Sequence, residues 1–502
     1  MIEFKCPSLL TLLVILIEMV ANSQMAVLAA KPSLQESPLR LSEPVEVIIA
    51  DLESYILEFI REQDIPGVGI ALIRDGEVVW TEGFGIANVL TSEPITPETL
   101  FEVASNSKVV TAYIALRLVD QNLLSLDKPL NDYLPEPWLP PSEYRDVITL
   151  RHVLSHSSGL GHSTTSRHNL FAPGRGYSYS AVGFQYLQVV IEQVTGQSLE
   201  QVAQEMVFAP IGMSSSSFVN RSEFTPRTAN GHLHAILPAI AFAVLYLVSL
   251  VIVGFIGLVI LRIRTGQWQP TRRLLISTPT VAFVLSLLPA FLLFGYSSLW
   301  EFAWIIVLCG LILTFVFALT FLIGRIGIFR ISSKRPRQQI ALTIVWSVLV
   351  LIGIAFLTSS LNNLPVPKWT SVEPEAAGSM RATVGDMATF LIELSNPQHL
   401  SEERATQLQT PQVRLNSDLS WGLGPGIQHT RQGTTLWQWG QHIDFQSIII
   451  IYPEHNFGVV VCTNNDLLNP DVAMEIAHRA LSGKIEPIRR AIHLEFNYSE
   501  SD

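Results

Sequence analysis

Four long apolar runs in the middle of the chain constrain its architecture more than any other feature. They cover about residues 235–261, 274–294, 302–323 and 340–358, and none contains Asp, Glu, Lys, Arg or His. An α-helix needs about 20 apolar residues to cross the hydrocarbon core of a bilayer, and each run is near that length. Four uncharged runs in succession are not typical of buried helices in soluble proteins. We therefore expect residues 234–362 to form four transmembrane helices.

The loops between these runs predict the orientation of the spans. The loop after the second run, residues 295–301, has no positive charge, whereas the loops after the first and third runs are basic. Their basic residues are Arg262, Arg264, Arg272, Arg273, Arg325, Arg330, Lys334, Arg335 and Arg337. Because positively charged loops stay in the cytoplasm, both large flanking segments are expected to face outward. This predicts a multi-pass protein of the cell membrane with its large segments on the periplasmic or extracellular side.

Both ends of the chain differ in composition from the segments that follow or precede them. Residues 1–30 combine Lys5, an apolar stretch and small residues, which is typical of a signal peptide; an uncleaved N-terminal anchor is the alternative. Residues 31–44 contain Pro32, Pro38 and Pro44 and are expected to form a linker. Residues 486–502 are expected to form an acidic tail.

The composition excludes several classes of function. A net charge of −11 argues against nucleic acid as a partner. The chain has three cysteines, none at a metal-ligand spacing, so neither a disulfide framework nor a metal or other cofactor is expected. His152 and His156 are four residues apart, as in zinc-binding helices, but no Glu follows His152 and no third ligand is apparent. We expect both histidines to have structural roles.

Residues 45–233 and 366–485 are predicted to be two parts of one domain. In the first part, two β-like runs flank Asp75-Gly76, a pair that favours a hairpin turn. Near the other end, residues 446–452 and 457–463 form a second pair of β-like runs. An even number of spans returns the chain to the side that it left, as a single interrupted domain requires.

Helical stretches, including 107–119 and 183–194, separate these hairpins. Strands near both ends with helices between them predict an α+β fold. Its antiparallel sheet would be formed by both termini and flanked by helices, and the all-α transmembrane segment would interrupt it.

Ser105 and Lys108 form a Ser-x-x-Lys tetrad at the expected start of a helix. Residues three apart share one face of a helix, so the lysine amine lies within reach of the serine hydroxyl. A desolvated lysine can act as the base that makes a serine nucleophilic. The alternative is a helix-capping serine beside a solvated lysine.

Several segments outside the apolar block, taken in order, resemble one known family. They are residues 65–69 (IPGVG), 101–108 (FEVASNSK), 148–160 (ITLRHVLSHSSGL), 177–180 (YSYS), 374–388 (PEAAGSMRATVGDMA) and 421–424 (WGLG). The chain resembles the penicillin-binding-protein-type serine hydrolases, specifically their class C β-lactamase-like branch. The resemblance implies a β-lactamase/transpeptidase-like fold into which the four apolar runs are inserted near residues 228–231.

The resemblance also implies roles for individual residues. Ser105 would attack a carbonyl carbon and form an acyl-enzyme, while Lys108 and Tyr179 would share the proton transfers. The oxyanion hole would consist of the backbone N–H groups of Ser105 and Gln441.

Two motifs depart from the family pattern. Ala181 stands where the second motif usually has Asn. The third motif, usually Lys or His, any residue, then Gly, becomes Gln438-Trp439-Gly440, and Asp444 stands where a later glycine is usual. His442 would share a strand face with Gln438 and could partly replace the missing positive charge. An alignment shifted to residues 442–444 would restore the histidine but lose the glycine.

Without the cation, recognition of a substrate carboxylate should be weak, so the resemblance implies poor β-lactamase activity and a peptide, amide or ester substrate. The predicted function is a membrane-bound, outward-facing serine hydrolase whose partners are such a small substrate and the lipid bilayer. The alternative is a catalytically weak relative that binds cell-wall peptides or β-lactams as a membrane sensor. A transporter is disfavoured because the four runs contain no ionisable residue.

Overall fold

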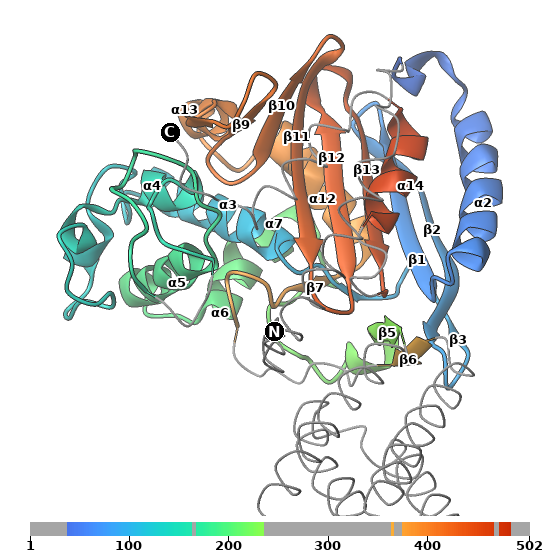
Figure 1. The fold of residues 1–502 in the computed structure, drawn as a ribbon, viewed down its shortest axis with the longest axis horizontal. Helices are drawn as coiled ribbons and strands as arrows, with labels where there is room; N and C mark the ends of the chain where they lie inside the picture. The colour runs from blue at the N-terminus through green and yellow to red at the C-terminus, as the bar shows by residue number, and fades with distance from the viewer. Residues whose placement is uncertain (1–37, 163–166, 235–362, 366–373, 466–470, 483–502) are drawn as a thin grey trace, which may run out of the picture.

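A nine-stranded antiparallel sheet forms the centre of the computed structural model, which describes residues 38–162, 167–234, 363–365, 374–465 and 471–482 (Figure 1). The strand order is β3-β2-β1-β13-β12-β11-β10-β9-β8. The strands are β1 Gly67–Arg74, β2 Glu77–Asn88, β3 Glu93–Pro94, β8 Val413–Arg414, β9 Leu419–Trp421, β10 Gly426–Thr430, β11 Gly433–Gln441, β12 Gln446–Tyr452 and β13 Phe457–Thr463. Two shorter sheets pair β4 Phe101–Glu102 with β7 Arg381–Ala382 and β5 His232–His234 with β6 Asn363–Pro365.

The sheet joins the two parts of the domain, as predicted. Strand β1 pairs with β13, in a register that places Val68 opposite Thr463. The turn between β1 and β2 has φ of 55° at Asp75 and 80° at Gly76, which are the left-handed values of the favoured two-residue hairpin turns. All residues of β12 and β13 are buried, because helices cover both faces of these central strands.

Helices lie on both faces of the sheet (Figure 1). Helices α2 Val45–Glu62 and α14 Val472–Leu481 cover one face, and α3 Asn106–Asp120 and α12 Val384–Ser395 cover the other. The remaining helices are α4 Leu150–Leu154, α5 Ala181–Thr195, α6 Leu199–Ala203, α7 Ala209–Ile211 and α13 Glu402–Gln409. The short 3₁₀ helices are η1 Arg40–Ser42, η2 Leu130–Tyr133, η3 Arg145–Val147, η5 Thr225–Arg227 and η6 Pro453–His455, and η4 Gln204–Phe208 is a π-helix.

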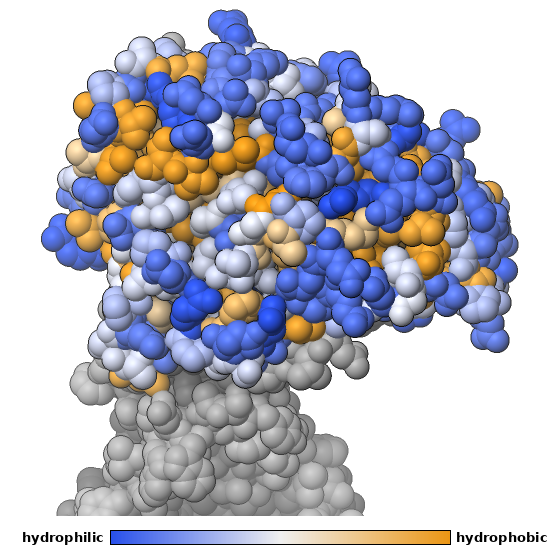
Figure 2. Space-filling model, turned by 180° about the vertical axis from the view of Figure 1, so that it is seen from behind, coloured by the Kyte–Doolittle hydropathy of each residue, from blue (hydrophilic) through white to orange (hydrophobic). Residues whose placement is uncertain are grey.

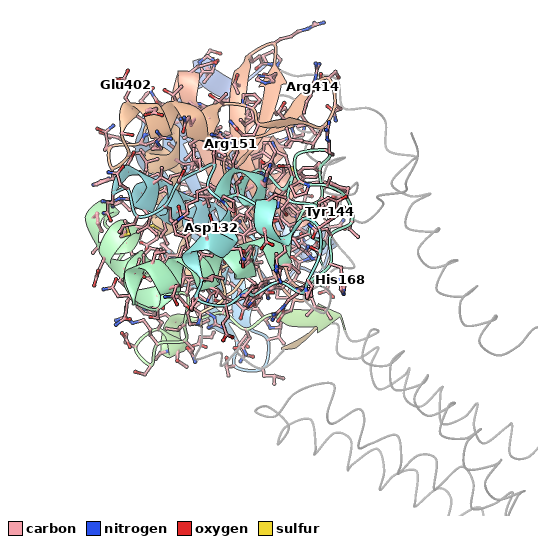
Figure 3. All side chains as sticks on the ribbon, turned by 90° about the vertical axis from the view of Figure 1, so that its left-hand side faces the viewer. Asp132, Tyr144, Arg151, His168, Glu402 and Arg414 are labelled. Atoms are coloured by element: carbon pink, nitrogen blue, oxygen red, sulfur yellow. The ribbon has the colours of Figure 1, made fainter. Side chains whose placement is uncertain are left out.

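Arg151 of α4 connects the helical part of the domain, which includes α4 and the loop that carries Asp127, to the edge of the sheet (Figure 3). Its Nε lies 2.7 Å from Asp127 Oδ1, and its Nη1 donates to Gln412 Oε1 at 2.9 Å. Gln412 directly precedes β8, so one side chain connects a loop of the helical part with the outermost strand.

Strands β5 and β6 bring together the two ends of the central segment. The pairing sets His232 opposite Pro365 and His234 opposite Asn363, at the base of the domain in Figure 1. The four predicted spans lie outside the described residues, as do the predicted signal segment and acidic tail. Among the helices that the structure describes, none has the length and apolar character needed to cross a membrane.

The C-terminal end of the expected linker packs against the domain. Leu39 is buried, and Arg40 forms an ion pair with Asp51 of α2 at 2.7 Å.

Figure 2 shows the molecule from behind the view of Figure 1, and polar and apolar residues are interspersed on this face. Exposed single apolar side chains such as Leu57 and Leu170 are ordinary features of protein surfaces.

Candidate active site

Ser105 lies at the junction between β4 and α3, where the backbone turns sharply. Ala104 just before it has φ of 47°, a conformation that residues with a Cβ rarely adopt, and Ser105 occupies the position before the first helical residue. Its side chain makes no capping hydrogen bond, so the helix-capping alternative is wrong. The hydroxyl oxygen instead accepts a hydrogen bond from Lys108 Nζ at 2.9 Å.

Lys108 is almost completely buried, with 2% of its surface exposed. Besides Ser105, its ammonium donates to the carbonyl oxygen of Ala377 at 2.6 Å. Nζ also lies 4.9 Å from the centre of the Tyr179 ring, within the range of a cation–π interaction. The lysine is thus held against both the serine and the tyrosine that the sequence singled out.

Tyr179 is buried in an aromatic cluster and bound to the third motif. Its phenol oxygen accepts a hydrogen bond from Gln438 Nε2 at 2.9 Å. The same amide nitrogen donates to the carbonyl oxygen of Trp439 at 3.0 Å, which fixes the orientation of the side chain. The Tyr179 ring packs against the rings of His156 and Trp439, with centroid distances of 4.3 and 5.3 Å.

His156 packs against the ring of Tyr179 and has a structural role. Its Nδ1 accepts a hydrogen bond from the backbone N–H of Ser180 at 3.0 Å. Burial holds the pKa of His156 well below its ordinary value, and the charge of Lys108 lowers it further, so the ring is neutral. His152 completes a capping box with Thr149 at the start of α4. The structural roles expected for both histidines are confirmed, and the described residues contain no cluster suited to a metal ion.

Gly440 is the point where β11 comes closest to the nucleophile. A Cβ at this position would lie 2.1 Å from the carbonyl oxygen of Val103 and 3.1 Å from the backbone nitrogen of Ser105. Only glycine allows this approach. The contact identifies residue 440 as the glycine of the third motif and argues against the alignment shifted to residues 442–444.

The backbone nitrogen of Ser105 lies beside β11, 3.1 Å from the position of a Cβ at Gly440, the residue before Gln441. His442 N–H donates to Phe445 O at 2.9 Å, back toward β12. Because hydrogen-bonding directions alternate along an antiparallel strand, the N–H of Gln441 points away from β12. Asn106 Nδ2 donates to Ser447 Oγ of β12, and Ser447 Oγ donates to Val103 O, each at 2.8 Å. These bonds hold the start of α3 against the strands that border it (Figure 1).

His442 contacts the buried side chain of Glu102. His442 directly follows Gln441, the last residue of β11, and its backbone N–H still pairs with the chain that leads into β12. Its Nδ1 lies 3.0 Å from Glu102 Oε2. The ring of His442 therefore lies against a buried carboxylate of the protein, and its expected role as a substitute cation next to Gln438 stays a prediction.

Ala181 is the first residue of α5 and contributes no polar group. The carbonyl oxygen of Ala377 provides a hydrogen-bond acceptor for Lys108 that the missing Asn side chain cannot. Sequence reasoning missed Ala377 and Glu102. A backbone carbonyl has no signature in a sequence, and Glu102 could have been noted only as a charged residue within the apolar surroundings of the tetrad.

Comparison with known proteins gives a consistent result. The family model described as Beta-lactamase matches residues 52–246 and 339–484. Esterase EstB from Burkholderia gladioli is 30% identical over 216 residues, which cover 36% of this chain and 55% of the esterase. Protein flp from Staphylococcus aureus (strain MRSA252) is 23% identical over 201 residues, covering 36% of this chain and 40% of that protein. The matches thus span about half the length of these curated relatives or less.

Two solved structures share the fold. The octameric penicillin-binding protein homologue from Pyrococcus abyssi has a TM-score of 0.55 at 19% identity, covering 86% of this chain and 76% of the other. EstCE1, described as a hydrolase with promiscuous acyltransferase activity, has a TM-score of 0.54 at 15% identity, covering 87% of this chain and 98% of the other.

Proposed function

Since the chain belongs to the beta-lactamase family of serine hydrolases, we propose that it cleaves ester or amide bonds through an acyl-Ser105 intermediate. The observation that carries the proposal is the 2.9 Å hydrogen bond from a buried lysine to the Ser105 hydroxyl, with Tyr179 packed against the same lysine. Within the family, the order of the motifs favours the class C-like branch.

The reaction begins when Ser105 Oγ attacks the substrate carbonyl carbon and its proton passes to the Lys108–Tyr179 pair. The negative charge that develops on the carbonyl oxygen is stabilised by the N–H groups of Ser105 and Gln441. The bond to the leaving group then breaks, and the pair returns the proton to the departing alcohol or amine. A water molecule attacks the acyl-serine in the second half, and Ser105 regains its proton as the acid is released.

We propose uncharged esters or amides, including peptides, as the substrate class. In the third motif, Gln438 supplies a neutral amide, and its nitrogen is already bound to Tyr179 and to the Trp439 carbonyl. The site therefore has no cation at this position to attract a substrate carboxylate, a group that β-lactams carry. The names Esterase EstB and EstCE1, a hydrolase, support the assignment to ester chemistry.

We also propose that residues 235–362 anchor the domain in a membrane with the hydrolase part outside the cytoplasm. Four uncharged runs and the basic loops between them support this topology. The pairing of β5 with β6 supports it as well, because a segment with an even number of spans must begin and end on one side.

The direct test uses a fluorophosphonate probe, which phosphonylates activated serines. Full-length wild-type protein should be labelled and should hydrolyse p-nitrophenyl acetate, whereas folded Ser105→Ala should do neither. A fluorescent penicillin should label the wild type only weakly. Absence of Ser105-dependent labelling and hydrolysis in folded protein would overturn the proposal.

A further inference from the structure

Glu102 lies three residues before Ser105 and is almost completely buried. Each of its carboxylate oxygens binds a different segment of the chain. Oε1 accepts a hydrogen bond from Arg381 Nη2 at 2.7 Å, and Oε2 lies 3.0 Å from His442 Nδ1. One buried side chain thus connects three segments that are far apart in the sequence.

Each of these three segments carries a different part of the proposed catalytic machinery. Glu102 belongs to β4, which leads into Ser105. Arg381 belongs to β7, which follows the segment whose Ala377 carbonyl binds Lys108. His442 directly follows Gln441, whose N–H is a proposed oxyanion donor. Glu102 is therefore placed to hold nucleophile, lysine acceptor and oxyanion donor in a fixed spacing.

The electrostatics keep this connection in its charged form. Burial by itself would raise the pKa of Glu102, but the hydrogen bonds and charges of His442 and Arg381 outweigh it and hold the pKa below its ordinary value. Charge-assisted hydrogen bonds are the stronger kind, and a buried charge that loses one partner is strongly destabilised. The contact between Glu102 and His442, the residue that follows β11, should therefore resist displacement.

We propose that Glu102 is a positioning residue for the reaction, which fixes the distance between Ser105 and the oxyanion donor on Gln441. The proposal rests on the proposed hydrolase function. Glu102 acts through the segments that it joins rather than on the substrate. Because oxyanion donors act when negative charge develops, a small displacement of Gln441 should lower kcat and leave KM nearly unchanged.

Glu393 provides a matched control. The side chains of Glu102 and Glu393 are 9% and 8% exposed, and their histidine partners His442 and His399 are 32% and 33% exposed. Glu393 lies in α12, where it binds Tyr113 and His399. Replacing either glutamate by glutamine removes one buried carboxylate. Glu393 contacts α3 through Tyr113, more than one helical turn beyond Lys108, whereas Glu102 contacts segments directly next to the proposed catalytic groups.

The experiment measures p-nitrophenyl acetate hydrolysis by full-length wild type, Glu102→Gln and Glu393→Gln, with rates divided by the concentration of Ser105 titrated with fluorophosphonate. For Glu102→Gln we expect kcat to fall about 10- to 100-fold, with KM within about threefold of wild type. For Glu393→Gln we expect a lower Tm and a kcat within about twofold of wild type. A Glu102→Gln kcat that matches Glu393→Gln would overturn the proposal.

A second variant covers the case in which Glu102→Gln does not fold. His442 is only half-buried, so His442→Ala should fold, and it loosens the same link from the other side. We expect its kcat to fall several-fold at unchanged KM, and an unchanged kcat would contradict the role of the link. Loss of Ser105 dependence in the wild type would instead overturn the hydrolase function itself, so the two failures are distinguishable.

Discussion

The amide nitrogen of Gln438 donates a hydrogen bond to the phenol oxygen of Tyr179 at 2.9 Å, and both residues are buried. A neutral donor thus lies beside the proposed proton acceptor, at the first position of the third motif, where related serine hydrolases usually have a cation. It stabilises negative charge on the phenol oxygen less than a cation would. Residue 438 should therefore influence the pH dependence of the reaction.

Substitutions of Gln438 should shift the acid limb of the kcat/KM profile according to the charge that they introduce. Gln438→Met removes the donor, which makes deprotonation of the Lys108–Tyr179 pair harder and should move the limb up by about one pH unit. Gln438→Lys adds a cation and should move the limb to lower pH. The measurement is ester hydrolysis between pH 5 and 10. Identical limbs in all three proteins would contradict this role.

Gly440→Ala should abolish activity. A Cβ at residue 440 would lie 2.1 Å from Val103 O, and no rotamer relieves a contact with backbone. The strand must move away from Ser105, so we expect at least a 100-fold loss of kcat, as for removal of an oxyanion donor. The control is Gly385→Ala in α12, where the nearest atoms lie 3.9 Å from the new Cβ and activity should persist. Comparable losses in both variants would refute the argument.

Asp444 should make the folded state less stable as pH rises. Burial, with the charge of Glu102, raises the pKa of Asp444 to about 7, against about 3.9 in an unfolded chain. Between these values the folded state binds more protons at this residue than the unfolded state does. Stability is therefore lost with rising pH over this window, by up to about 4 kcal/mol.

The test compares the wild type with Asp444→Asn in chemical unfolding at pH 5 and pH 8. The variant lacks the titrating group, so its advantage in free energy of unfolding should be larger at pH 8. An advantage that does not change with pH would show that Asp444 is not the group responsible.

Cysteines introduced at Arg272 and Lys368 should label from opposite sides of the membrane. Arg272 lies in the first basic loop, which we expect in the cytoplasm, and Lys368 lies after the last apolar run. A membrane-impermeant maleimide applied to intact cells should reach the cysteine at 368 but not that at 272, with Cys6 and Cys309 replaced by serine. A cysteine at Lys128, on the hydrolase part, serves as the outward control. Labelling of both positions from one side would refute the four-span topology.

The parts of the site that follow local rules could be predicted from the sequence. The three-residue spacing of Ser105 and Lys108 specifies one helical face, and Asp75-Gly76 specifies a hairpin turn, and both are present. The identity of Tyr179 came from the resemblance, and its contact with Lys108 agrees with it.

The parts that depend on tertiary contacts could not be predicted. The Ala377 carbonyl reaches Lys108 only because β7 pairs with β4, and nothing in the local sequence specifies that pairing. The contact between His442 and Glu102 is a second example, because the two residues are 340 positions apart in the sequence. The buried carboxylate of Glu102 determines where the ring of His442 lies.

The antiparallel pairing of His234 with Asn363 places the two ends of the intervening segment next to each other on the hydrolase fold. The pair has the geometry of the base of a β-hairpin, which a two-residue turn such as Asn-Gly can join. We therefore expect that a chain in which such a turn replaces residues 235–362 still folds into the same hydrolase domain.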